Sequence, residues 1–294
     1  CLGLQPQDVL VASTGVIGVN MPMDKVQSGI IAAANTLSEA GDANAALAIM
    51  TTDLINKEIA VEIEIGGQAV RIGAMAKGSG MIHPNMATML GFITTDAAIS
   101  SKCLQIMLNA AVNKSFNMIS VDGDTSTNDM VLILANGRAG NHIIDDPDSK
   151  DALAFYQALE NIAVGLAKMI ARDGEGANHL IEVQVNNAAD EKTARMIARS
   201  ITSSSLTKAA VFGLDANWGR ILAAAGYSGA SFDPGRVDIY LGAEMVARDG
   251  MGLVFDEEQA RRELEKETVV ITVDLKAGEY SATAWGCDLS YEYV

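Results

Sequence analysis

Apolar positions along this chain follow two different periods, and each period predicts a different kind of element. Every second residue from Ile59 to Ile65 is a branched apolar residue, which is the pattern of a strand with one buried face. Between Asp24 and Glu39 the apolar residues instead recur every three or four positions, which predicts an amphipathic helix. Because both periods recur along the rest of the chain, we predict a mixed α/β fold.

Turn and capping residues set the limits of these elements. Gly66 and Gly67 separate two apolar runs and predict a β-hairpin. A shift in composition near residues 186–190 suggests a domain boundary, with a larger unit at 1–187 and a smaller α/β unit at 188–294. The predicted helices cover 24–39, 43–50, 100–116, 147–172, 191–200, 219–225 and 256–266, and the predicted strands cover 9–12, 58–65, 70–72, 86–93, 118–121, 130–135, 180–185, 237–241, 269–275 and 279–284.

The stretch from Ala76 to Leu90 breaks both periods. Gly78, Gly80 and Pro84 forbid a regular helix or central strand there, because glycine opens positive φ and proline removes an amide donor. The stretch is therefore predicted to be a shaped loop that leads into a buried strand. Thr88 lies at the junction of loop and strand, so a rigid element would hold its hydroxyl.

Bulk composition restricts the class of protein. Hydrophobic residues make up 49% of the 294 residues and charged residues 20%, which excludes a disordered chain. No apolar run approaches the ~18 residues of a membrane span, and the net charge of −16 disfavours binding to nucleic acid or an anionic membrane. Three widely spaced cysteines favour a reducing compartment, so we expect the cytoplasm. The chain begins with Cys1 and stops in sequence typical of folded structure, so we expect truncation at both ends.

Thr88 is a candidate nucleophile, although a threonine hydroxyl is weak at neutral pH and needs a base. The three histidines lie in loops or at element ends and none is paired in sequence with an acid, which disfavours a Ser-His-Asp type of triad. Cleavage of the Ala87–Thr88 bond would instead free an α-amine, whose reference pKa of about 7.7–8.0 suits a base. The alternative is that Thr88 is an ordinary buried strand threonine. Lys77 could be a carboxylate clamp or a cation that lowers the pKa of a freed amine, and the alternative is a solvated lysine beside glycines.

Two further patterns resemble known functional motifs but lack residues that those motifs require. Residues 122–129 imitate the start of a calcium loop, but the sixth position is Thr127 rather than glycine and the twelfth is Ile133 rather than glutamate. Residues 205–208 match the Ser-x-x-Lys of penicillin-recognising enzymes without the Ser-Asp-Asn partner. The cysteines lack metal-ligand spacing, and we expect no metal.

Seven motifs, taken together and in this order, closely resemble the ornithine acetyltransferase family, also called glutamate N-acetyltransferase. Each motif alone is weak, but the ordered set spans essentially the whole chain and is specific. The resemblance implies a layered α/β sandwich, in which a larger domain processes itself as N-terminal-nucleophile enzymes do and a smaller α/β domain follows. The motifs lie at 13–18, 51–53, 76–90, 122–129, 173–177, 215–220 and 285–289.

The resemblance also implies the site residues. Self-cleavage would fall between Ala87 and Thr88, giving an α piece of 87 residues and a β piece of 207 residues that begins with the nucleophile Thr88. The oxyanion donors would be Thr14 and Gly15. The residues implied to bind substrate are Thr88 itself, Thr51 (with Thr52 left open), Lys77 and Glu175.

The implied reaction transfers an acetyl group from N-acetylornithine to glutamate through an acetyl-threonine intermediate, in arginine biosynthesis. The resemblance implies ping-pong kinetics, no cofactor and a heterotetramer of two α and two β pieces, and it leaves open whether acetyl-CoA also serves as donor. Two other functions remain open at this stage. One is a non-catalytic fragment that binds ornithine-like ligands, and the other is an amidohydrolase that uses Thr88 with water as acceptor.

Overall fold

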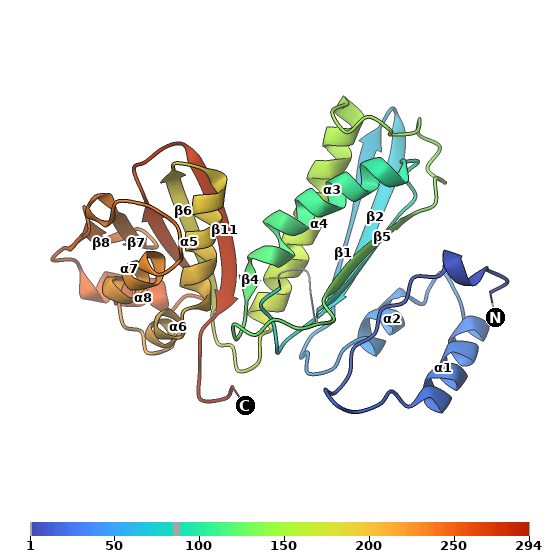
Figure 1. Cartoon of the computed structure of the whole chain (residues 1–294), viewed down its shortest axis with the longest axis horizontal. Helices are drawn as coiled ribbons and strands as arrows, with labels where there is room; N and C mark the ends of the chain where they lie inside the picture. The colour runs from blue at the N-terminus through green and yellow to red at the C-terminus, as the bar shows by residue number, and fades with distance from the viewer. Residues whose placement is uncertain (1, 85–88, 294) are drawn as a thin grey trace.

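The computed structural model describes residues 2–84 and 89–293 and confirms the predicted mixed α/β class (Figure 1). Its helices are α1 (Met23–Asn35), α2 (Asp42–Ala48), α3 (Ser101–Lys114), α4 (Lys150–Arg172), α5 (Glu191–Ser203), α6 (Ser205–Phe212), α7 (Trp218–Gly226) and α8 (Glu257–Leu264). Its strands are β1 (Lys57–Ile65), β2 (Gln68–Lys77), β3 (Leu90–Thr95), β4 (Ile119–Ser120), β5 (Met130–Ala135), β6 (Leu180–Ala188), β7 (Asp238–Leu241), β8 (Glu244–Arg248), β9 (Met251–Gly252), β10 (Thr268–Asp274) and β11 (Tyr280–Cys287).

The first sheet has the strand order β1-β2-β3-β5. The predicted hairpin forms β1 and β2, and its turn uses Gly66 and Gly67, which have φ of +57° and +78°. Strand β3 runs antiparallel to β2 and parallel to β5. Lys77 therefore pairs with Leu90, and Leu90 pairs with Met130, so the end of β2 and the starts of β3 and β5 meet at one end of the sheet.

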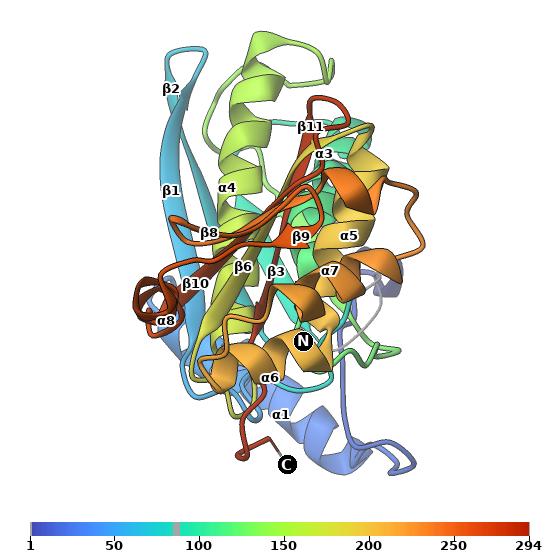
Figure 2. The same ribbon diagram turned by 90° about the vertical axis from the view of Figure 1, so that its left-hand side faces the viewer.

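The second sheet has the order β4-β11-β6-β10-β7-β8-β9 and takes strands from both sides of the predicted domain boundary. Helix α4 contacts β1 and β2 of the first sheet and β11 of the second, so α3 and α4 lie between the two sheets (Figure 1). Figure 2 shows the long β1–β2 hairpin beside α4. The predicted boundary between residues 187 and 188 falls inside β6, and the division into two domains stays a prediction.

Local sequence signals explain where several elements begin. Ser100, the first residue of the helix predicted over 100–116, caps α3: its hydroxyl accepts a hydrogen bond from the amide of Cys103. Helix α4 begins after Ser149, whose hydroxyl caps the amide of Ala152, rather than at residue 147 as predicted. Its apolar face is completely buried and joins the core that continues between the two sheets.

Some predicted elements differ in the structure. Residues 9–12 are not a strand: they are largely exposed and pair with no strand in the described part of the chain. A strand needs a partner to satisfy its backbone groups, which apolar sequence alone does not provide. The periodicity also missed α6, β8 and β9, which are short elements.

Candidate functional site

A cavity of about 430 Å³ lies where the end of β2, the end of α4 and the C-terminal segment meet. Its lining brings together five residues that the sequence predicted for the site, although they come from four separate stretches of the chain. The lining residues are Thr14, Gly15, Val16, Thr51, Lys77, Gly80, Met81, Asp124, Glu175 and Tyr293. Thr51 is in the lining and Thr52 is not, which favours Thr51 as the substrate threonine. The predicted cleavage pair, Ala87 and Thr88, lies outside the described residues.

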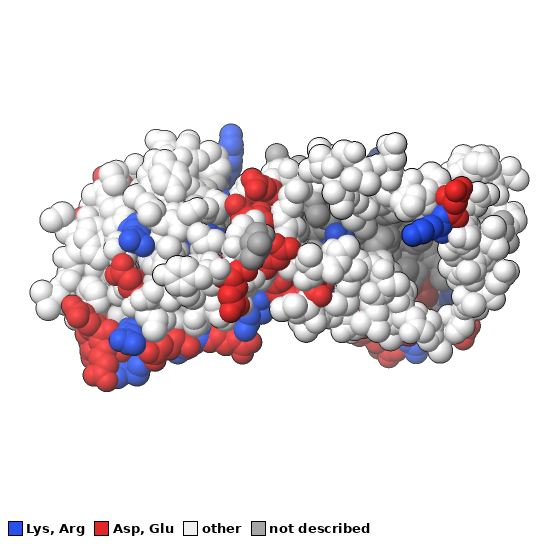
Figure 3. Space-filling model, turned by 90° about the horizontal axis from the view of Figure 1, so that it is seen from below, with Lys and Arg blue, Asp and Glu red and all other residues white. Residues whose placement is uncertain are grey.

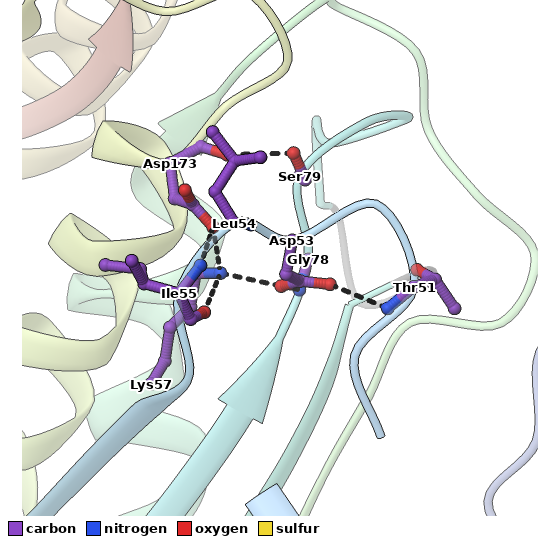
Figure 4. Close-up of polar contacts among 8 residues, drawn as sticks. All are labelled: Thr51, Asp53, Leu54, Ile55, Lys57, Gly78, Ser79 and Asp173. Carbon is purple, nitrogen blue, oxygen red and sulfur yellow. Dashed lines mark hydrogen bonds and ion pairs between the residues drawn. The ribbon is translucent and has the colours of Figure 1, made fainter. Parts of the chain in front are cut away.

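A buried ion network supports this cavity (Figure 4). The side chain of Lys57, the first residue of β1, is fully buried, and its Nζ lies 2.6 Å from Asp53 Oδ1 and 2.6 Å from Asp173 Oδ2. Burying three charges is costly unless they pair closely and accept further hydrogen bonds. Both carboxylates meet this condition.

The two carboxylates bind the backbone of the segments that carry the predicted site residues. Asp53 accepts hydrogen bonds from the amides of Gly78 (2.7 Å) and Thr51 (3.2 Å). Burial raises the pKa of Asp53, but the hydrogen bonds from Lys57 and the two amides together bring it below its usual value. Asp53 therefore fixes the Thr51 backbone and the start of the loop after Lys77.

Asp173 performs the same task at the end of α4. Its Oδ2 accepts hydrogen bonds from the amides of Leu54 (3.0 Å) and Ile55 (3.4 Å), and its carbonyl oxygen accepts one from the Ser79 hydroxyl (2.8 Å). The Glu175 amide in turn donates to the Ser79 carbonyl at 3.2 Å. The loop after β2 and the loop after α4 are thereby locked side by side (Figure 4).

The Glu175 carboxylate lies directly over Gly80. A Cβ atom at Gly80 would be 2.6 Å from Glu175 Oε1, so a larger residue here would require the Glu175 carboxylate to shift. Lys77 is buried, with an exposed fraction of 3%. Burial lowers the pKa of Lys77, while the carboxylates of Asp53 and Asp129 oppose that shift. The structure therefore excludes the interpretation of Lys77 as a solvated surface lysine.

The loop at 122–129 organises the other side of the cavity. The carboxylate of Asp122 accepts hydrogen bonds from the amides of Met81 (2.6 Å) and Ile82 (3.0 Å), and from the Tyr293 hydroxyl (3.2 Å). The amide side chain of Asn128 reaches the carbonyl of Ser13 at 3.4 Å, next to Thr14. The carboxylate of Asp122 and the side-chain amide of Asn128 thus hold protein segments together around the cavity.

His83 does not have a free ring nitrogen for base catalysis. Its Nδ1 lies 3.0 Å from the Ser120 hydroxyl, and its Nε2 lies 2.9 Å from an Arg199 guanidinium nitrogen, which can only donate. Burial, with Arg199 beside the ring, lowers the pKa of His83 to about 4. His83 is therefore a neutral imidazole with both nitrogens engaged.

The sequence motifs include Asp53, Asp129 and Asp173 without assigning a role to any of them, and Lys57 lies in no motif. Lys57 stands where the alternating pattern of β1 begins, and nothing local distinguishes it from a solvated lysine. Asp129 accepts a hydrogen bond from the amide of Met89 at 2.6 Å. Burial raises the pKa of Asp129 to about 6.

Comparison with known proteins gives consistent results. A family model described as the ArgJ family matches residues 1–294. The arginine biosynthesis bifunctional protein ArgJ of Symbiobacterium thermophilum is 61% identical over 293 residues, covering 100% of this chain and 73% of that protein. The protein of the same name from Caldanaerobacter subterraneus subsp. tengcongensis is 52% identical over 297 residues, with the same coverage. The crystal structure of arginine biosynthesis bifunctional protein ArgJ from Bacillus halodurans has a TM-score of 0.69 and 48% identity, covering 70% of this chain and 97% of that one.

Proposed function

The chain belongs to the ArgJ family of bifunctional arginine biosynthesis enzymes, and we propose that it moves an acetyl group from N-acetylornithine to glutamate. The observation that carries this proposal is the shared cavity. Thr14, Gly15, Thr51, Lys77 and Glu175 are scattered over more than half of the sequence, yet all five line it. Residues with unrelated structural roles would not be expected to line one cavity together.

The proposed reaction starts from a chain cleaved between Ala87 and Thr88. The free amine of Thr88 takes the hydroxyl proton while Thr88 Oγ1 attacks the acetyl carbonyl of N-acetylornithine. Thr14 and Gly15 donate hydrogen bonds to the oxyanion that develops. The Thr88 ammonium gives this proton to the ornithine nitrogen as the amide bond breaks, and ornithine leaves. The amine of glutamate then attacks the acetyl-threonine ester, and its proton returns through the Thr88 amine to Thr88 Oγ1 as N-acetylglutamate leaves. This order of steps gives ping-pong kinetics.

The charged residues of the cavity suit amino-acid substrates. The buried Lys77 ammonium is placed to bind a substrate α-carboxylate, because a cation with few water contacts binds an anion more strongly than an exposed one does. The Glu175 carboxylate is the proposed partner of the basic end of ornithine. One cavity would thus hold both ends of a zwitterionic substrate.

The test combines electrophoresis with a coupled assay. Purified chain should run as two pieces, Thr88→Ala should stay intact, and ornithine release beyond one equivalent per enzyme should require glutamate. Repeated turnover that releases ornithine without glutamate would favour the hydrolase alternative. Ligand binding without any release would favour the non-catalytic alternative. An intact wild-type chain would contradict the cleavage.

We further propose a cytoplasmic location and an assembly of two α and two β pieces. Replacing N-acetylornithine with acetyl-CoA in the same assay tests whether acetyl-CoA is a second acetyl donor. No helix in the described part of the chain is long and apolar enough to cross a membrane. Mass measurement of the native assembly tests the stoichiometry.

A further inference from the structure

The backbone of Met81, in the lining of the cavity, is strained. Its φ is +53°, in the left-handed region, where the Cβ atom of any residue other than glycine crowds the following carbonyl oxygen. Of the five described non-glycine residues with a positive φ, Met81 is the one that lines the cavity. Such strain persists only where the surrounding structure enforces it, and it is concentrated at functional sites. The conformation of Met81 therefore points to a role in the cavity.

Contacts on both sides of Met81 enforce this conformation. The carboxylate of Asp122 accepts hydrogen bonds from the amides of Met81 (2.6 Å) and Ile82 (3.0 Å), and the Ile82 side chain is completely buried. On the other side, the Ser79 hydroxyl donates to the carbonyl of Asp173 at 2.8 Å. Met81 is thus held between two anchored neighbours, in the lining of the cavity.

Met81 adds an apolar surface beside the charged groups of the cavity. The residue is 38% exposed, so part of its side chain is open to a ligand. Glu175, the proposed partner of the basic end of ornithine, lies over Gly80, the residue before Met81. Lys77, the proposed partner of the α-carboxylate, is the last residue of β2, and Met81 lies on the loop that follows it.

The proposed acetyl donor has a matching apolar part. In N-acetylornithine, methylene groups join the α-carbon to the terminal ammonium, and their transfer out of water is favourable where an apolar side chain receives them. The unbranched thioether chain of methionine adapts well to such a surface. We propose that Met81 packs against these methylene groups and determines the length of donor side chain that the site accepts, an inference that rests on the proposed function.

The experiment compares N-acetylornithine with Nα-acetyllysine, a donor that is longer by one methylene group. With glutamate as acceptor, kcat/KM is measured for each donor, and the ratio within one preparation does not depend on the fraction of folded enzyme. The wild-type chain should prefer N-acetylornithine. Met81→Gly removes the side chain and relieves the backbone, whereas Met81→Ala shortens the side chain and keeps the strain. In both variants the preference should fall by about 10-fold or more, since one methylene group in an apolar site changes such a ratio by about 10–200-fold.

Two control variants separate side-chain length from other effects. Met81→Leu has a side chain of similar volume and should keep the wild-type preference. Leu214 has a φ of +52°, close to that of Met81, but it lines a different cavity. Leu214→Gly therefore makes the same change of backbone away from the site, and it should also keep the wild-type preference.

Equal kcat/KM for the two donors in the wild-type chain, or an unchanged preference in both Met81→Gly and Met81→Ala, would overturn the inference. A change in Met81→Gly alone would also overturn it, because the effect would then come from the backbone and not from the side chain. A wild-type chain that releases neither ornithine nor lysine would instead contradict the proposed function itself, which separates the two failures.

Discussion

Single residues decide how the cavity is held, and Lys57 is the clearest example. Replacing Lys57 with methionine leaves Asp53 and Asp173 buried without a counter-ion. We expect a loss of about 3–5 kcal/mol in the free energy of unfolding, measured by urea denaturation. Each carboxylate retains its amide donors, so the fold itself should persist.

Lys276 provides a matched control for Lys57. It also bridges two aspartates, Asp238 and Asp249, at 2.6 and 2.7 Å, but its side chain is 31% exposed whereas that of Lys57 is fully buried. Water screens a partly exposed ion pair more than a buried one, so Lys276→Met should cost less stability than Lys57→Met. Equal losses would show that burial is not what makes the Lys57 network important.

Gly80 tests the position of the Glu175 carboxylate. In Gly80→Ala the new methyl group would overlap Glu175, which must move away. Displacement of a substrate-binding group by about 1 Å can cost about 100-fold in rate, so we expect kcat/KM for N-acetylornithine to fall by about that factor. Gly73→Ala, on β2 before this loop, meets nothing closer than 3.8 Å and should retain activity. Full activity in Gly80→Ala would mean that Glu175 does not bind substrate.

At the scale of elements, the sequence predicts what depends on local periodicity and capping. The β1–β2 hairpin, the Ser100 cap and the long helix α4 all follow from neighbouring residues. The ion network could not be predicted in the same way, because Lys57 and Asp173 are 116 positions apart. Local patterns predict which face of an element is buried. They do not predict which charged residue from a distant part of the chain will contact that face.

The C-terminal segment is another element whose role depends on tertiary contacts. Tyr293 lines the cavity, and its hydroxyl donates to Asp122. Burial raises the pKa of Tyr293 to about 12, and the Asp122, Glu175 and Asp124 carboxylates add to the effect because they disfavour a phenolate. No local sequence pattern predicts this contact, because 171 positions separate Tyr293 from Asp122.

Absorbance titration measures the Tyr293 contact. Subtracting the curve of Tyr293→Phe from the wild-type curve isolates the ionisation of Tyr293, which should occur near pH 12. In Asp122→Asn the same difference should move to lower pH, because one negative charge beside the phenol is gone. An unchanged midpoint would mean that the segment does not rest on Asp122 in solution.

At the scale of the molecule, the acidic charge disfavours polyanionic partners. The face in Figure 3 carries more acidic than basic side chains, gathered near its middle and along one edge. With a net charge of −16, the chain should repel polyanions. Inside the cavity, however, the buried Lys77 places a positive charge that can bind a substrate carboxylate.

The fold also determines what happens to the pieces after the proposed cleavage. Strand β2 of the first piece pairs with β3 of the second over six residue pairs, from Ile72 opposite Thr95 to Lys77 opposite Leu90. Strand β1 packs on α4, which also belongs to the second piece, and the apolar core includes residues from both. Cutting one loop bond removes none of these contacts.

We therefore expect the cleaved pieces to co-elute in gel filtration and to separate only in denaturant. Because unfolding then also dissociates the pieces, the melting temperature of the cleaved chain should rise with protein concentration. Intact Thr88→Ala provides the comparison: within the same assembly, any concentration dependence of its melting should be weaker, because its two segments remain covalently joined. Separation of the wild-type pieces without denaturant would contradict the packing of β2 against β3 as the contact that holds them together.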